Sequence, residues 1–395
     1  MPAADRRTKQ GFPEDNLAYV PKLVALQVLR ALAAFAIALL HLEPEWRLRG
    51  LVTADWRRPF PLEAGVDVFF VISGFVMVYA SHALFGRGGV ARDFVMRRIA
   101  RVVPLYWLTT ALVLAIATTK PDLMRSTVAT AELVLASFLF VPWPRPDGLV
   151  QPLYSLGWTL NYEMFFYALF AAALLLRLGA RATVAVVSAC LAALVGIGLL
   201  VPDLPQPLGF WTSPMQIEFI LGMALGLARL SGLTAPLALR LGLAALGIGL
   251  FWLAGGEAAG RYGQNAAFLY AIPSACLVAA FALSAGRPSG QDRNREPDRW
   301  PARLGESLGD ASYAIYLLHP FAIRGSLLVI DRLGLGPALG AAGLSIVGLA
   351  ATAALALLSY RLLERPLLRL ARRWTTRPAR AVPHQTGGAR AADPG

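Results

Sequence analysis

Apolar and polar stretches alternate along nearly the whole chain. Ten apolar stretches each have close to the ~20 residues that a helix needs to cross a bilayer, and polar turns separate them. They lie at 23–42, 64–84, 103–119, 157–176, 182–201, 213–230, 235–254, 264–285, 310–331 and 337–358. The pattern predicts an all-α fold: a polytopic membrane helix bundle with about ten transmembrane helices and both termini in the cytoplasm.

Composition and charge agree with a membrane protein. Hydrophobic residues make up 56% of the 395 and charged residues only 15%, which is too apolar for a soluble globular protein. The net charge of +13 would suit nucleic acid, but most of the 37 Lys and Arg residues fall in segments that this topology places in the cytoplasm. That asymmetry follows the positive-inside rule, so the expected partner of the basic charge is membrane lipid, and no nucleic acid is expected.

The two ends of the chain differ from the apolar region between them. Residues 1–22 are polar and are expected to form a cytoplasmic N-terminal segment. Residues 371–395 are rich in Arg, Ala, Pro and Gly, which is typical of a disordered basic cytoplasmic tail. The transmembrane domain is therefore expected to span 23–370. Cys190 and Cys276 fall inside apolar stretches and are predicted to be free thiols.

The first apolar stretch contains two ionisable residues, Arg30 and His41. They are eleven residues apart, so at ~100° per residue they differ by only ~20° around the helix and lie ~16 Å apart along it. Charged groups in hydrocarbon are costly and usually face a water-filled cavity that has a function. We therefore expect both side chains to face a polar cavity inside the bundle.

A second polar stripe lies on the fourth apolar stretch. Thr159, Glu163 and Tyr167 follow each other at i, i+4 and i+8, so they share one helix face. Glu163 lies ~9 Å below the outer boundary, a depth close to that of His41. The two residues are either solvated at the interface or form a hydrogen-bonded pair in which the carboxylate fixes the imidazole tautomer. Asp67 is a further candidate to orient His41.

Three arginines precede the third apolar stretch. Arg97 and Arg98 lie four and three residues before Arg101, so the three can converge on one anion. They are either ordinary topology signals that anchor phospholipid or a clamp for the phosphates of a cytoplasmic cofactor.

The ninth apolar stretch carries the last polar face. Ser312, Tyr316 and His319 share it, which suits either a substrate channel or plain interhelical hydrogen bonding. No metal site is predicted, because no two His, Cys or carboxylate residues show ligand spacing on one element.

Taken together, these motifs resemble the membrane-bound acyltransferase family 3, and most closely its exopolysaccharide O-acetyltransferases. The matching motifs are Arg30-x10-His41, Gly-Val-Asp-x-Phe-Phe-x-x-Ser-Gly-Phe at 65–75, Arg-x-x-Arg before Pro104-Leu-Tyr-Trp, Trp-Thr-Leu-x-x-Glu at 158–163, Ser-Tyr-x-x-Tyr-Leu-x-His-Pro at 312–320, and Glu364-Arg365-Pro366. The resemblance implies an enzyme that transfers an acyl group, often acetyl, from acetyl-CoA or another acyl-CoA to an extracytoplasmic or lipid-linked saccharide.

The resemblance also implies roles for individual residues. His41 would act as general base on the sugar hydroxyl or carry the acyl group itself, and Glu163 would orient it. Arg30 and Tyr313 would stabilise the oxyanion. The implied catalytic residues are His41, Glu163 and Arg30, and the implied donor-binding residues are Arg98, Arg101, Tyr313 and His319.

The expected location is the cell inner membrane, with a saccharide acceptor and the polysaccharide synthesis machinery as partners. Two other functions are alternatives: the first would also explain the intramembrane Arg, Glu and His, and the second predicts that Arg30, His41 and Glu163 tolerate alanine together. The first is a transporter of a lipid-linked glycan or small solute, and the second is a scaffold within a polysaccharide synthesis complex.

Overall fold

The fold is built from helices. The computed structural model describes residues 23–52, 60–120, 129–255, 266–284 and 300–375, and within them the only β pairing is an isolated bridge between Pro144 and Val150. A helix occupies each of the ten predicted stretches: α1 Val24–Leu40, α3 Gly65–Ala80, α4 Val90–Thr119, α6 Trp158–Leu175, α7 Ala180–Leu200, α9 Gln216–Leu230, α10 Leu237–Ala254, α11 Ala266–Ala282, α13 Ser312–Arg332 and α14 Gly336–Ser359. The all-α prediction is confirmed.

Seven helices in the described part of the chain are long and apolar enough to cross a membrane. They are Val24–Leu48, Leu62–Ala80, Val90–Thr119, Ala180–Leu200, Leu237–Ala254, Ser312–Arg332 and Ala338–Ala371, and Phe268–Ala282 is a shorter apolar helix. Helix α6 falls outside this set because Asn161 and Glu163 lower its hydropathy, and α9 because it has only 15 residues. The protein is therefore a multi-pass membrane protein. The count of ten spans and the cytoplasmic side of the termini stay predictions.

Helix α4 is longer than the sequence pattern suggested. It begins at Val90, thirteen residues before the predicted start, and continues through Pro104. The turns of α4 that carry the arginines pack against α13 and against α15 (Arg365–Thr375). Charged side chains on these turns would be costly in contact with lipid, and the packing shields them from it. Arg98 and Arg101 are thus fixed on a helix rather than in a loop.

The chain beyond α14 continues as helix. A π-helical turn, Tyr360–Glu364, joins α14 to α15, so α15 runs five residues past the domain boundary expected at 370. The predicted N-terminal segment 1–22 and residues 376–395 of the predicted tail lie outside the described residues. Cys190 and Cys276 are free thiols, as predicted.

Helices α3 and α9 cross at very close range. A Cβ added at Gly74 would lie 2.3 Å from the carbonyl oxygen of Phe219, and one added at Gly222 would lie 2.0 Å from that of Val71. Only glycine permits such an approach, which is how membrane helices commonly pack.

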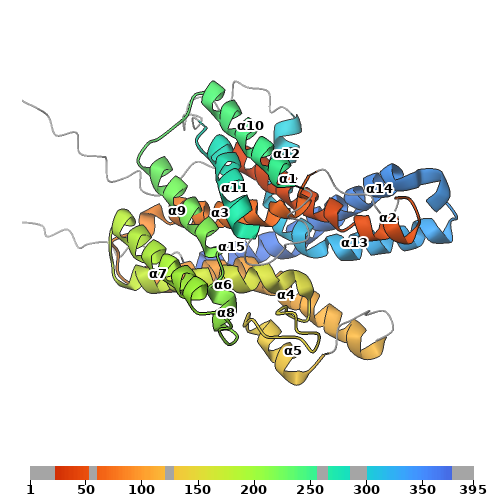
Figure 1. Cartoon of the computed structure of the whole chain (residues 1–395), viewed down its shortest axis with the longest axis horizontal. Coiled ribbons are helices and arrows are strands. Elements are labelled where there is room, and N and C mark those ends of the chain that lie inside the picture. Colours follow the sequence, from red (N-terminus) through yellow and green to blue (C-terminus); the bar gives the residue numbers. More distant parts are fainter. Residues whose placement is uncertain (1–22, 53–59, 121–128, 256–265, 285–299, 376–395) are drawn as a thin grey trace, which may run out of the picture.

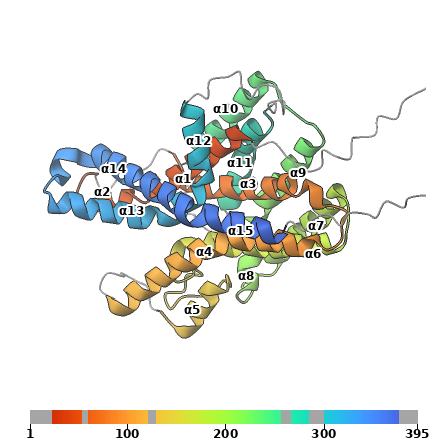
Figure 2. The ribbon, with the colours of Figure 1, turned by 180° about the vertical axis from the view of Figure 1, so that it is seen from behind.

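The helices form two groups, which meet where α9 packs against α7 (Figure 1). Helices α3, α9, α10 and α11 form one group, and α4, α6, α7 and α15 form the other. Helix α1 packs against α3, α12 (Trp300–Asp310) and α13. The pair α13 and α14 projects away from both groups with α2 (Glu43–Leu48) beside it, as the view from behind also shows (Figure 2).

Candidate active site

A cavity of about 150 Å³, lined by both apolar and polar side chains, lies among α1, α3, α4, α6 and α13. Its polar lining residues are Arg30, Ser73, Arg98, Arg101, Thr159, Glu163, Tyr167, Ser312, Tyr313 and Tyr316. Five of the seven site residues expected from the sequence are among them, whereas the two histidines are not. Thr159, Glu163 and Tyr167 all line the cavity, so they share one face of α6, as predicted.

Glu163 is held by neighbours other than the one predicted. Its Oε1 accepts a hydrogen bond from Ser73 Oγ at 3.2 Å and another from the Tyr167 hydroxyl. The positive charges of Arg30 and Arg98 also act on it electrostatically. The predicted hydrogen-bonded pair of Glu163 with His41 is therefore wrong, because the Glu163 carboxylate turns into the cavity.

Arg30 faces the cavity, as its helical position predicts. Its Nη1 donates to Gln27 Oε1 at 3.3 Å, and it makes no ion pair with any described residue. Because His41 lies three helical turns away, ~16 Å along α1, Arg30 is too far to contact an oxyanion formed beside that imidazole. The oxyanion role expected for Arg30 does not fit this geometry, whereas a role in binding an anionic ligand in the cavity does.

Arg98 is available to a ligand. Its guanidinium lies over the rings of Phe94 and Tyr167, at 5.3 and 5.6 Å from their centroids. Its buried Nε has no hydrogen-bond partner among the residues described. Arg97, by contrast, is exposed and donates to the Asp93 carbonyl oxygen, so two of the three arginines converge rather than three.

Arg101 also lines the cavity, but its guanidinium already has partners. Its Nη1 lies 3.1 Å from Glu364 Oε2, and its Nη2 donates to the Asp310 carbonyl oxygen at 3.1 Å. The guanidinium covers the ring of Tyr313 at 5.8 Å. The Tyr313 hydroxyl donates to the Val102 carbonyl oxygen at 2.6 Å, so it is not free to stabilise an oxyanion as expected.

The two histidines lie against each other. The ring centroids of His41 and His319 are 4.7 Å apart. Each Nδ1 contacts the carbonyl oxygen four residues earlier, at 2.8 Å for His41 and at 3.3 Å for His319. A carbonyl only accepts, so Nδ1 carries the proton in each ring and Nε2 keeps its lone pair. His319 is fully buried, and its Nε2 has no hydrogen-bond partner among the described residues.

Tyr316 connects the cavity to the histidines. Its side chain lines the cavity, and its ring centroid lies 6.3 Å from that of His319. Its hydroxyl donates to the Leu156 carbonyl oxygen at 2.9 Å and contacts Thr159 Oγ1 at 3.0 Å. His319 therefore belongs with His41 rather than with the donor-binding residues, which corrects its expected role.

The site thus has two ends. The arginine end consists of Arg30, Arg98 and Arg101 with Glu163, and the histidine end consists of His41 and His319.

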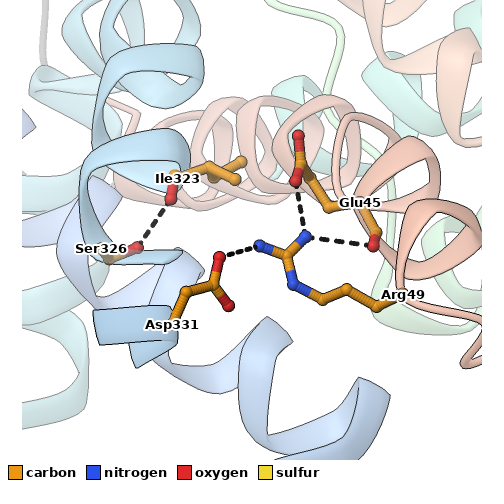
Figure 3. Close-up of polar contacts among 5 residues, drawn as sticks. All are labelled: Glu45, Arg49, Ile323, Ser326 and Asp331. Atoms are coloured by element: carbon orange, nitrogen blue, oxygen red, sulfur yellow. Dashed lines mark hydrogen bonds and ion pairs between the residues drawn. The ribbon is translucent and has the colours of Figure 1, made fainter. Parts of the chain in front are cut away.

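Helix α2 begins two residues after His41, and a charged contact holds it in place (Figure 3). Arg49 donates to Glu45 Oε2 and to Asp331 Oδ2, each at 2.7 Å, which ties α2 to the end of α13. Beside it, Ser326 donates to the Ile323 carbonyl oxygen at 2.9 Å. We call Arg49, Glu45 and Asp331 the α2 latch.

A separate carboxyl pair escaped the sequence reasoning. Asp67 on α3 and Glu218 on α9 act on each other electrostatically, and both are at most 1% exposed. Asp67 therefore lies near Glu218 at the crossing of α3 and α9, and no hydrogen bond within the described ranges joins it to His41, which it was expected to orient. An ionisable residue inside an apolar stretch, the signal used for Arg30, would have drawn attention to Glu218.

No group of three or more His, Cys, Asp or Glu residues in the described ranges is placed to hold a metal ion.

The fold and the site define a multi-pass helical membrane protein with a charged internal cavity. The acyltransferase domain model matches residues 23–361, so the chain belongs to this acyltransferase family and is an acyltransferase. The resemblance drawn from the motifs is confirmed. No solved structure gives a significant match.

Three relatives give the match more detail. The exopolysaccharide production protein ExoZ of Rhizobium meliloti is 38% identical over 310 residues, which cover 78% of this chain and 90% of the relative. Protein 2 in the picA locus of Rhizobium radiobacter is 32% identical over 41% of this chain and 85% of its own length. The peptidoglycan O-acetyltransferase OatA of Listeria monocytogenes is 26% identical over 88% of this chain and 56% of its own length.

Proposed function

We propose that this protein is an O-acetyltransferase of the cell inner membrane. It moves an acetyl group from acetyl-CoA, bound from the cytoplasm, to a hydroxyl group of an exopolysaccharide or its lipid-linked precursor. The names of two relatives support this acceptor and this reaction, because one is an exopolysaccharide production protein and the other a peptidoglycan O-acetyltransferase.

The observation that carries the proposal is an arginine-lined cavity with two imidazoles beyond it, on the other side of Tyr316. Arg98 has unused donors in the cavity, and Arg30 makes no ion pair with a described residue, so both can bind the phosphates of an acyl-CoA. Glu163 offsets part of their charge. The acyl arm would extend past Tyr316 toward the histidine end.

His41 is proposed as the general base. Its Nδ1–H is fixed by the Ile37 carbonyl oxygen, so Nε2 can accept a proton. The acceptor hydroxyl oxygen attacks the thioester carbonyl carbon while His41 Nε2 takes the hydroxyl proton. When the carbon–sulfur bond breaks, the leaving thiolate takes that proton, which gives the acetyl ester, free thiol and neutral His41. His319 lies against the imidazole and holds it in place.

A transfer assay on purified protein in nanodiscs tests the proposal. With radiolabelled acetyl-CoA and a saccharide acceptor, label should move to the saccharide in the wild type and not in His41→Ala. Mass spectrometry of the host polysaccharide with and without the protein would name the product. If no label moves while a solute crosses liposomes that contain the protein, a transporter replaces the enzyme. If alanine at Arg30, His41 and Glu163 together leaves polysaccharide synthesis unchanged, the protein is a scaffold.

A further inference from the structure

The motif Glu364-Arg365-Pro366 has no part in the mechanism above, yet its carboxylate is buried. Glu364 is only 3% exposed. Its Oε2 accepts a hydrogen bond from Arg101 Nη1 at 3.1 Å, and its Oε1 has no hydrogen-bond partner within the described ranges. A carboxylate in such a place is costly unless an opposite charge compensates it, and Arg101 is that charge.

The backbone around Glu364 is irregular for a clear reason. The Arg365 N–H bonds to the Tyr360 carbonyl oxygen, five residues earlier, which defines a π-helical turn. Pro366 has no N–H, so the Leu362 carbonyl cannot receive its usual helical partner, and the turn widens there. Glu364 is buried in this turn while its neighbours Arg361 and Arg365 are exposed.

The ion pair of Arg101 with Glu364 extends from the cavity wall to a residue outside the cavity. Arg101 lines the cavity, whereas Glu364 is not among the lining residues. The π turn packs against α4, the helix that carries Arg101. Glu364 and the Asp310 carbonyl oxygen each hold one terminal nitrogen of the guanidinium, whose flat face covers Tyr313. Arg98, on the same helix, has no such support.

We propose that Glu364 is a positioning residue that fixes the guanidinium of Arg101 for binding a phosphate of the acyl donor. This inference rests on the proposed function, which makes Arg101 part of the donor site. An arginine that is already ordered loses less side-chain entropy when it binds an anion. Glu364 also acts electrostatically on Arg30, so its charge offsets the mutual repulsion of the cations that line the cavity.

Single variants test the role of the carboxylate. Glu364→Gln keeps the shape of the side chain and removes its charge, so the KM for acetyl-CoA should rise about tenfold while kcat changes less than about twofold. Glu364→Asp keeps the charge and should restore part of the affinity. Arg361→Gln, an exposed change in the same π turn, is the matched control and should leave both constants unchanged. Thermal unfolding of each variant reports on folding separately.

A double-mutant cycle tests whether Glu364 acts through Arg101. Arg101→Gln should raise the donor KM, and adding Glu364→Gln to it should raise the KM no further. Additive effects of the two changes, or a Glu364→Gln variant with a lower unfolding temperature and an unchanged KM, would overturn the inference. If Glu364→Gln does not fold, Glu364→Asp and its combination with Arg101→Gln take its place in the cycle. An unchanged KM in Arg101→Gln alone would instead reject the donor site of the proposed function.

Discussion

The arginine end and the histidine end of the site differ in charge and in their access to the cavity. At the arginine end, three permanent charges line an open cavity and are balanced only in part by Glu163 and Glu364. At the histidine end, two imidazoles pack ring against ring, and neither lines the cavity. Permanent charge is tolerated in a membrane protein where water or a ligand can solvate it, whereas an imidazole can be neutral and is cheaper to bury.

The comparison suggests a division of labour. Under the proposed function, the arginine end binds the donor and the histidine end takes the proton from the acceptor hydroxyl, with Tyr316 between them. Variants at the two ends should therefore change different kinetic constants. A donor-binding residue should act mainly on KM, and a general base mainly on kcat.

The largest effect is expected at His41. His41→Ala removes the proposed general base and should lower kcat by about 10³-fold, within the range of general base catalysis. The donor KM should change little because the arginine end is intact. Single-turnover transfer of labelled acetyl in nanodiscs measures both constants. His82→Ala, which changes a histidine outside the site, is the control. An unchanged kcat in His41→Ala would show that the general base does not lie at the histidine end.

The next largest effect is expected at Arg98. Arg98→Gln removes a charge-assisted hydrogen bond worth about 1.5–3 kcal/mol, so the donor KM should rise about 10- to 100-fold with kcat nearly constant. Arg97→Gln is a close control because Arg97 is exposed on the same helix. Equal effects of the two substitutions would mean that general surface charge, rather than the cavity, attracts the donor.

A smaller effect, on kcat and not on the donor KM, is expected at His319. His319→Gln removes the ring that packs against His41, so kcat should fall about tenfold while the donor KM stays within about twofold of the wild type. Titration of the donor at saturating acceptor separates the constants. If KM rises instead, His319 belongs to the donor-binding residues, as the family resemblance implied.

The sequence predicted much of the fold and the composition of the arginine end. The length of the apolar stretches located a helix in each of the ten, and the rarity of ionisable residues in such stretches marked Arg30 and Glu163. Helical spacing was enough to place Thr159, Glu163 and Tyr167 on one face. These inferences succeeded because each concerns a single helix.

The contacts between helices could not be predicted in the same way. Equal depth suggested that His41 would meet Glu163, but depth does not determine which helices are neighbours, and α1 packs against α13. Because the sequence does not show which helices are neighbours, it also did not predict that Arg101 lies near Glu364 or that Asp67 lies near Glu218. Both pairs join residues distant in sequence, and no spacing rule connects them.

The smallest effect is expected at the α2 latch, next to the histidine end. Arg49→Gln should lower the free energy of unfolding by less than about 1 kcal/mol, since partly exposed ion pairs contribute little, and kcat should fall by less than about twofold. Partial burial disfavours the charge of Arg49, but its hydrogen bonds to Glu45 and Asp331 raise its pKa above the usual arginine value. A raised pKa means that the stability from Arg49 is complete below the ordinary arginine pKa and is lost only at higher pH.

The small effect of Arg49→Gln should therefore be equal at neutral and mildly alkaline pH, which denaturant unfolding at both pH values measures. Arg47→Gln, which breaks the exposed pair of Arg47 with Glu43 on the same helix, is the control. A drop in kcat as large as that of His319→Gln would show that the α2 latch sets the position of His41, because α2 begins two residues after it. In that case the histidine end would depend on a surface contact, while the arginine end is held by buried ones.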